Sequence, residues 1–305
     1  MVDEARALTE ALNGRWQGDY GMARCPAHED RNPSLRIKLG DNGRPLLRCF
    51  TGCSQEAVLD ALKARGLWEG RAGNWEPTEA ELAEIRRRRE AEEARQREKT
   101  AKARNWWQEA KPIDGTPAET YLRGRGITTA LPPTLRYHHS LKHGPTGLFL
   151  PALVAAVCAW PSREPSAVHR VFIKMTGGAA PVSESKLTYG PPGRGAVRLA
   201  RAGETLALTE GIETGLSVQQ VTGIPTWACL STSGLINVTL PDNTKTVVIY
   251  ADHDKSKRAD GTTFNPGREA AEKAKARFVD EGREAQIKMP KETGKDFNDL
   301  LRGVA

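Results

Sequence analysis

The chain has 305 residues, enough for two or three compact units, and 38% of them are hydrophobic. No run approaches the roughly 18 consecutive apolar residues that a membrane span needs, so no membrane-spanning segment is expected. The net charge of +7 favours a polyanionic partner, although charge alone is weak evidence for one. The acidic, amphipathic N-terminus differs from a secretory signal peptide, and a cytoplasmic location is expected.

The first predicted piece, residues 1–68, contains two closely spaced pairs of potential metal ligands. Cys25 and His28 are separated by two residues, and Cys49 and Cys53 by three. Two predicted strands, 34–39 and 45–50, join through a turn at 40–43 and would bring the pairs together. This spacing predicts a structural zinc ion held by three thiolates and one imidazole. Three free cysteines and a surface histidine are the simpler alternative.

A helix is predicted at residues 54–67, with Ser54 as its cap. The second piece, residues 69–111, is a predicted charged helical linker. It is mostly charged residues and alanine without an apolar stripe, which is typical of a solvated spacer helix. An arm that follows phosphates is the alternative, and the interleaved glutamates count against it.

The third piece, residues 112–203, combines helix and strand. A short helix is predicted at 119–127, and two strands of an antiparallel sheet at 148–160 and 167–175. The same piece carries four basic residues that could contact the phosphates of a nucleotide or a template, Arg170, Lys174, Lys186 and Arg198. Ordinary surface charge on a half-exposed sheet explains them almost as well.

The fourth piece, residues 204–305, alternates apolar strands with helices. The predicted strands are 205–209, 225–230, 245–251 and 284–289, and the predicted helices are 212–222, 266–281 and 296–302. Such alternation predicts a mainly parallel sheet with helices on its faces. The fold class expected for the whole chain is therefore α/β multidomain, with a mixed α+β part ahead of this sheet.

Carboxylates follow the ends of two of these strands. Glu210 follows the first, and Asp252 and Asp254 follow the third, where alternation along the chain points both aspartates the same way. Ligands of parallel sheets bind at this edge, and clustered carboxylates repel one another unless a hard cation such as Mg²⁺ or Mn²⁺ lies between them. Asp296 could join the group or merely cap a helix. Glu213, one helical turn beyond Glu210, is a weaker candidate. Loop capping by isolated acidic residues is the alternative to a site.

Taken together, these residues resemble the Toprim primases, the DnaG-type family with its phage, plasmid and mobile-element relatives. CPAH and CFTGC look like the family's Cys-His-Cys-Cys zinc ribbon. TEGIET looks like the glutamate motif that opens a Toprim fold, and YADHD followed by PGREAAEKA looks like its Asp-x-Asp motif. The order of zinc ribbon, linker, polymerase core and Toprim domain is also the order found in that family.

This resemblance implies a DNA-directed RNA polymerase that makes short RNA primers on single-stranded DNA from nucleoside triphosphates. It implies structural zinc at Cys25, His28, Cys49 and Cys53, a catalytic role for Glu210, and magnesium at Asp252 and Asp254. A replicative helicase would be a separate partner, in the replication of a phage, plasmid or other mobile element. Two alternatives stay open. One is Toprim strand cleavage of the nuclease or topoisomerase kind, and the other is a non-catalytic, zinc-containing, DNA-binding accessory protein of replication.

Overall fold

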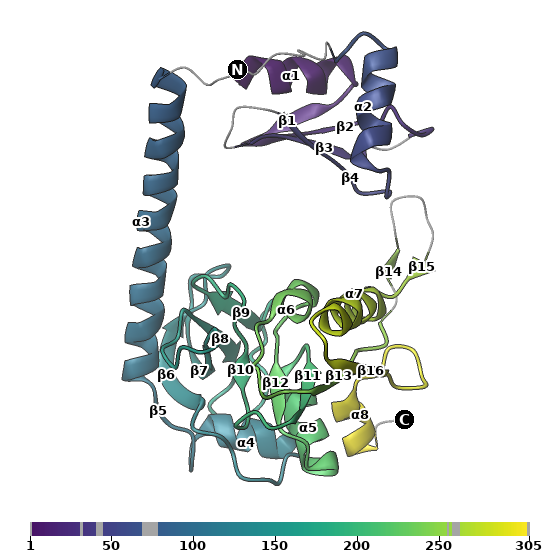
Figure 1. Ribbon diagram of the computed structural model, residues 1–305. Helices are drawn as coiled ribbons and strands as arrows, with labels where there is room; N and C mark the ends of the chain where they lie inside the picture. Colours follow the sequence, from purple (N-terminus) through teal and green to yellow (C-terminus); the bar gives the residue numbers. More distant parts are fainter. Residues whose placement is uncertain are drawn as a thin grey trace. The chain divides into compact units, whose positions relative to one another are not determined.

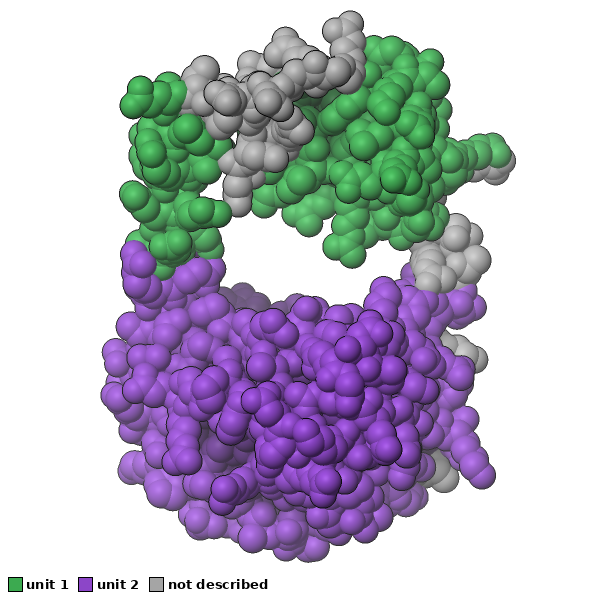
Figure 2. All heavy atoms as spheres, in the orientation of Figure 1, with its two compact units in different colours: residues 1–94 green, residues 95–305 purple. Residues whose placement is uncertain are grey.

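The computed structural model describes residues 2–30, 33–40, 45–68, 79–254, 256–257 and 263–303. The chain divides into two compact units, Met1–Ala94 and Arg95–Ala305 (Figures 1 and 2). The boundary falls inside one long helix, α3 (Glu79–Glu109), which contributes residues to both units. The division into four pieces that the sequence predicts, with boundaries at residues 68, 111 and 203, remains a prediction.

The first unit is built on a four-stranded antiparallel sheet. The strands are β1 (Arg15–Gln17), β2 (Tyr20–Ala23), β3 (Leu35–Leu39) and β4 (Pro45–Cys49), in that spatial order. Helices α1 (Val2–Ala11) and α2 (Gln55–Ala64) pack on the sheet through one core that includes Leu8, Ile37 and Leu62. The Ser54 hydroxyl accepts a hydrogen bond from the N–H of Ala57 and caps α2, as predicted. The predicted turn at 40–43 lies almost entirely outside the described residues.

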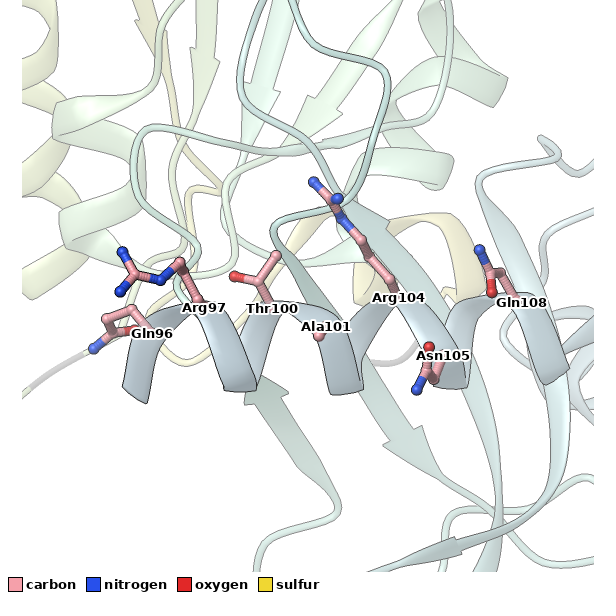
Figure 3. Close-up of a pocket in the computed structure, with 7 residues that line it drawn as sticks. All are labelled: Gln96, Arg97, Thr100, Ala101, Arg104, Asn105 and Gln108. Carbon is pink, nitrogen blue, oxygen red and sulfur yellow. The ribbon is translucent and has the colours of Figure 1, made fainter. Parts of the chain in front are cut away.

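Helix α3 changes character along its length. Its residues in the first unit are mostly exposed, which agrees with a solvated helix. In the second unit Ala103 is buried, Arg104 donates to the carbonyl of Pro165 at 3.1 Å, and Thr100 donates to the carbonyl of Ser166 at 3.3 Å. The surrounding side chains of this helix line a pocket of about 590 Å³ (Figure 3). This end of the helix is therefore held against the second unit.

The middle of the chain forms an antiparallel five-stranded sheet. Its order is β5-β6-β7-β8-β9, with β5 (Lys111–Pro112), β6 (Leu135–Lys142), β7 (Phe149–Val157), β8 (Ala167–Phe172) and β9 (Lys186–Tyr189). Helix α4 (Pro117–Gly124) precedes β6. The two predicted strands correspond to β7 and β8, and the predicted short helix to α4.

The C-terminal part forms a second five-stranded sheet with the order β10-β12-β11-β13-β16. The strands are β10 (Val197–Arg198), β12 (Thr226–Ala228), β11 (Thr205–Thr209), β13 (Thr246–Tyr250) and β16 (Glu284–Lys288). Every neighbouring pair is parallel except β10 with β12. Its helices are α5 (Ile212–Thr222), α6 (Thr232–Asn237), α7 (Pro266–Asp280) and α8 (Phe297–Arg302). A short pair, β14 (Ser256–Lys257) and β15 (Thr263–Phe264), precedes α7. The predicted α/β class with a mainly parallel sheet is confirmed.

The two faces of this sheet pack in different hydrophobic cores, because side chains alternate along each strand. Leu206 and Leu208 of β11 face α6 and α7, in a core that includes Phe278. Ala207, between them, faces α5. The core that holds Leu216 of α5 continues into the antiparallel sheet, so the two sheets of the second unit share buried residues. None of the described helices is long and apolar enough to cross a membrane.

Candidate metal centres

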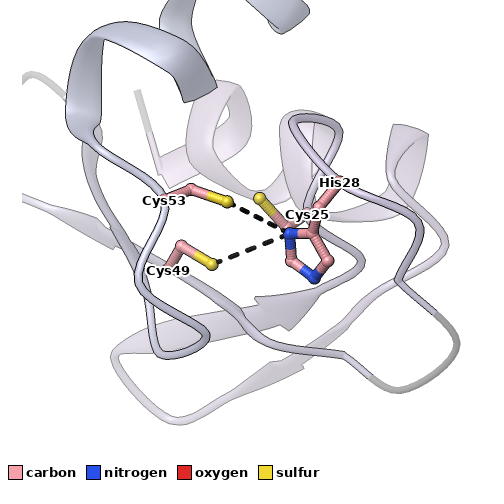
Figure 4. Close-up of side chains that lie close together, drawn as sticks. All are labelled: Cys25, His28, Cys49 and Cys53. Atoms are coloured by element: carbon pink, nitrogen blue, oxygen red, sulfur yellow. Dashed lines mark hydrogen bonds between the residues drawn. The ribbon is translucent and has the colours of Figure 1, made fainter. Parts of the chain in front are cut away.

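The four predicted zinc ligands come together in the first unit. One potential ligand atom from each of Cys25, His28, Cys49 and Cys53 lies within 4.8 Å of the others. Nδ1 of His28 faces two sulfurs, 3.2 Å from Sγ of Cys53 and 4.0 Å from Sγ of Cys49 (Figure 4). Within the described parts of the chain, this is the one group of three or more His, Cys, Asp or Glu side chains that meets this spacing. Three thiols and one imidazole fit a tetrahedral zinc ion.

Polar residues that were not predicted from the sequence contact these ligands. Asp30 Oδ2 accepts from the N–H of Cys25 at 2.7 Å and from the Ser34 hydroxyl at 2.6 Å. Nε2 of His28, on the side of the ring away from the sulfurs, lies 3.3 Å from the Thr51 hydroxyl oxygen and 3.8 Å from Oδ1 of Asp30. A hydrogen-bond partner at the far nitrogen of a ligating histidine fixes its tautomer and orientation, and Thr51 is within that distance. Burial raises the pKa of Cys25 to about 12, so metal binding there would release a proton.

Of the predicted carboxylates, Glu210 and Asp252 lie at the carboxyl edge of the parallel sheet, and Asp254 is exposed beyond it. Among the described residues, these groups do not meet the close spacing of the zinc ligands. Thr209 of β11 pairs with Tyr250 of β13, so the two strands end level and Glu210 and Asp252 follow at one edge. The first turn of α7 closes the other side. A Cβ atom on Gly267 would lie 3.2 Å from Oε1 of Glu210 and 2.7 Å from the backbone oxygen of Asp252. Only a glycine allows this close approach, which brings the positive end of α7 to the carboxylates.

The charge of Asp252 is poorly compensated. Burial raises its pKa most, and Glu210, Asp296 and Asp254 add to the effect, which brings the pKa to about 7 although Lys186 acts in the opposite direction. Oδ1 of Asp252 is buried and has no hydrogen-bond partner among the residues that the structure describes. Burial and then Asp254 also raise the pKa of Glu210. An unpartnered buried carboxylate oxygen among other carboxylates fits a hard divalent cation.

Asp296 has the capping role that the sequence left open. Its Oδ1 accepts from the N–H groups of Asn298 at 2.7 Å and Asp299 at 2.8 Å, at the start of α8. Its negative charge also acts on Asp252. Asn298 is buried and donates to the hydroxyl of Ser217 at 2.9 Å and the carbonyl of Arg125 at 2.8 Å. Helix α8 is therefore attached both to α5 and to the segment after α4.

An ion pair with one buried partner lies near Asp252 and joins Glu213 to Lys186. Glu213, at the start of α5, is 5% exposed. Its Oε1 lies 2.8 Å from Nζ of Lys186 and accepts from the Tyr121 hydroxyl at 2.6 Å. Burial would raise the pKa of Glu213, but Lys186 and Tyr121 hold it at about 2. The Lys186 side chain is 45% exposed. Its ammonium is therefore held by a buried carboxylate, while part of the side chain faces solvent.

The four predicted phosphate-binding residues have different surroundings. Of the four, Lys186 is the one whose charge acts on Asp252. Arg170 is 5% exposed, lies 4.9 Å from the centre of the Trp106 ring, and donates to the carbonyl of Lys142 at 3.2 Å. Lys174 is exposed beyond the end of β8. Arg198 donates to the carbonyl of Ser162 at 2.8 Å, on β10 at the edge of the parallel sheet.

Several residues around these centres gave no usable sequence signal. Tyr121, Arg125 and Asn298 approach the carboxylates through contacts between segments far apart in the chain. Asp30 was the one with a local signal, because an acidic residue two positions after His28 can reach the far side of the imidazole ring.

Two family models match this chain, one described as Toprim domain over residues 205–304 and one as Domain of unknown function (DUF7146) over residues 97–199. No curated protein matches. The similar solved structures include the zinc-binding and RNA polymerase domains of the Aquifex aeolicus primase. It is 16% identical, with a TM-score of 0.44, and the match covers 99% of this chain and 80% of that one.

A DNA primase domain from Pseudomonas aeruginosa is 14% identical with a TM-score of 0.43, over 67% of this chain and 74% of that one. The primase fragment of the bacteriophage T7 primase-helicase protein is 13% identical with a TM-score of 0.36, over 90% and 92%. The family match agrees with the parallel sheet and with the positions of TEGIET and YADHD within it. The C-terminal third of the chain, residues 205–304, is thus the part that is similar to Toprim domains.

Proposed function

We propose that this protein is a DNA primase, which makes short RNA primers on single-stranded DNA by nucleotidyl transfer. The observation that carries the proposal is the buried Oδ1 of Asp252, which no described residue hydrogen-bonds and which is affected by the charges of Glu210, Asp254 and Asp296 at the carboxyl edge of a Toprim-like sheet. A chain that combines such an edge with a Cys-His-Cys-Cys group has both a centre for phosphate chemistry and a separate module for template contact.

Asp252 and Asp254 would hold Mg²⁺ or Mn²⁺, which when bound neutralises phosphate charge and orients the phosphates of the incoming nucleotide. Glu210 has a raised pKa, which suits a carboxylate that accepts the proton of the attacking 3′-hydroxyl and holds it. Lys186, held by Glu213, which in turn accepts from Tyr121, presents its ammonium to a phosphate oxygen.

The zinc module would contact the template. Phe50 is 55% exposed after β4, and the Arg48 guanidinium lies 5.5 Å from its ring centre. An exposed aromatic ring beside a cation can stack on an unpaired base while the cation meets the backbone. We expect a separate replicative helicase as partner, and replication of a phage, plasmid or other mobile element as the setting.

The test is primer synthesis by the full chain with single-stranded DNA, Mg²⁺ and labelled nucleoside triphosphates. The Asp252→Asn, Asp254→Asn double variant should lose activity by about a hundredfold or more, because the phosphate charge is no longer neutralised. A matched control is Asp242→Asn, Asp280→Asn, which removes two exposed carboxylates elsewhere in the second unit and should retain full activity.

Other products would favour the alternatives. Cleaved template without new RNA would indicate strand cleavage at the same carboxylates. Binding of DNA with neither reaction, even with zinc content verified and a helicase supplied, would indicate an accessory protein. Equal primer synthesis by wild type and site variant would place the chemistry elsewhere.

A further inference from the structure

A second cavity, of about 630 Å³, lies in the second unit at the opposite edge of the parallel sheet from the carboxylates. Ala202 and Asn243 line it from the segments that precede β11 and β13, whereas Glu210 and Asp252 follow those strands. Each of these strands spans about 13 Å. The cavity is therefore separate from the candidate metal centre, and its size is typical of a small-molecule site.

Two tryptophans give this cavity aromatic walls. Trp227 of β12 is 1% exposed, and its Nε1 donates to the carbonyl of Ala200 at 3.0 Å. Trp160, after β7, is 39% exposed. The Arg198 guanidinium lies over both rings, 5.4 Å from the centre of Trp160 and 5.0 Å from that of Trp227. The arginine is itself held by the carbonyls of Cys158 and Ser162. The aromatic wall is thus preorganised, and Trp160 offers surface to a ligand.

The lining of the cavity is cationic. Arg163, Arg198 and Arg201 line it, and no Asp or Glu does among the described residues. Arg163 and Arg201 are exposed, and neither guanidinium has a hydrogen bond or ion pair with any residue that the structure describes. The neighbouring Glu164 points its carboxylate to Arg104, at 3.0 Å. Two uncompensated guanidinium groups next to an exposed indole ring are complementary to an anion attached to a flat ring.

We propose that this cavity binds one nucleotide unit, with its base against Trp160 and its phosphate at Arg163 and Arg201. Bases of any sequence can stack on an aromatic side chain, and guanidinium groups bind phosphate through paired N–H donors. The unit can be a free nucleotide or one residue of a single strand. Binding at this cavity is independent of nucleotidyl transfer, because Trp160, Arg163 and Arg201 do not belong to the candidate metal centre.

The test is a binding measurement with the full chain in buffer without added divalent metal, so that failure of the proposed catalytic function does not affect it. Adenosine monophosphate is titrated by calorimetry, and a fluorescently labelled ten-residue oligothymidylate by anisotropy. The Arg163→Ala, Arg201→Ala double variant and the Trp160→Ala variant should each bind about tenfold more weakly. Trp160→Phe, which keeps an aromatic face, should recover most of the affinity.

The matched control is Lys273→Ala, Lys275→Ala on α7, which also removes two positive charges and should leave binding unchanged. Weakened binding of both probes, or of adenosine monophosphate alone, supports a site for free nucleotides. Weakened binding of the oligonucleotide alone supports a site for one residue of a strand. If neither probe distinguishes the cavity variants from the wild type and the control, or if the control variant weakens binding equally, the proposal is wrong.

Discussion

Asp252 is a buried carboxyl group whose charge the surrounding residues disfavour, with a pKa raised to about 7 by burial and by three other carboxylates. A carboxyl with a raised pKa binds its proton more tightly in the folded state. Its contribution to stability therefore falls as the pH rises from about 4 to about 7 and stays low above that. The protonated form of Asp252 favours stability, whereas metal binding needs the ionised form.

Replacing Asp252 with asparagine should therefore stabilise the metal-free protein while removing activity. We expect a gain of about 1–3 kcal/mol at pH 8 and a clearly smaller gain at pH 4.5, where the wild-type carboxyl of the folded protein is protonated. Thermal denaturation in metal-free buffer at the two pH values measures the difference. Asp242→Asn, at an exposed site, should show no such gain. A lower melting temperature for Asp252→Asn at pH 8 would contradict the assigned charge repulsion.

Lys186 and Glu213 allow a second prediction at the residue scale. Lys186→Ala leaves the Glu213 carboxylate buried, with the Tyr121 hydroxyl as its remaining side-chain hydrogen-bond partner among the described residues. The substitution should destabilise the fold by about 1–3 kcal/mol, an amount limited because Lys186 is 45% exposed. Adding Glu213→Gln removes the unpaired charge and should recover part of the loss. Urea denaturation measures both effects.

The stabilisation that the Lys186–Glu213 ion pair provides depends on pH. The Glu213 pKa is held at about 2, so the stabilisation from the ion pair is complete above the ordinary carboxyl pKa, about 4.3, and is lost as the pH falls toward 2. The difference between wild type and Lys186→Ala should therefore shrink in acid. Lys174→Ala, at an exposed lysine, serves as control and should cost almost nothing. An equal cost at both lysines would mean that the ion pair contributes no stability.

Among the helices and strands, those predicted correctly have strong local signals. β11 and β13 are apolar runs followed within two residues by a carboxylate, and α7 begins at an Asn265–Pro266 cap. β6 was missed because its sequence, LRYHHSLK, is polar. Its buried His138 is satisfied by a partner 29 residues away, Glu109 at 3.3 Å, which no local pattern indicates.

The same contrast holds for the candidate site. Glu210 and Asp252 follow buried strands and could be placed at one sheet edge from strand direction alone. The hydrogen bond of Tyr121 to Glu213 joins residues 92 positions apart, so it depends on how α4 meets α5. Arg170 and Arg198 look alike as basic residues in the sequence, but the fold uses both guanidinium groups to bind backbone carbonyls and cover aromatic rings.

The strands and helices of the first unit should depend on zinc. Its core is small, and Cys25 and Cys49 are themselves buried in it. Removing the metal with a chelator should raise hydrogen exchange in α1, α2 and β3 by about tenfold or more, because metal binding supplies much of the folding free energy. Protection in β11 and β13 should stay unchanged. Exchange measured by mass spectrometry on the full chain tests this.

Re-addition of zinc is the control and should restore protection, and Cys49→Ser should reproduce the effect of the chelator. Unchanged protection in α1 and α2 after verified metal removal would mean that the hydrophobic core alone maintains this unit. Loss of protection in β11 as well would mean that the two units do not unfold independently.

At the scale of the whole molecule, the boundary within α3 separates two units with their own cores. The second unit contains both five-stranded sheets, the carboxylates and the cavity with Trp160, and its sheets share buried residues. The first contains the Cys-His-Cys-Cys group. Two binding modules on one chain increase affinity for a strand that both can reach, because the second contact becomes intramolecular.

Residues 95–305 alone should therefore fold and should still be stabilised by Mg²⁺. Mg²⁺ should raise the melting temperature of this fragment as it does that of the full chain, and more at pH 8 than at pH 6, because the proton on Asp252 competes with the metal. Single-stranded DNA should bind about a hundredfold more weakly, since one of the two modules is missing. Adding residues 1–94 as a separate chain at micromolar concentration should not restore the affinity, because the effective concentration of the covalent link is lost. Full DNA affinity in the fragment would show that template contact belongs entirely to the second unit.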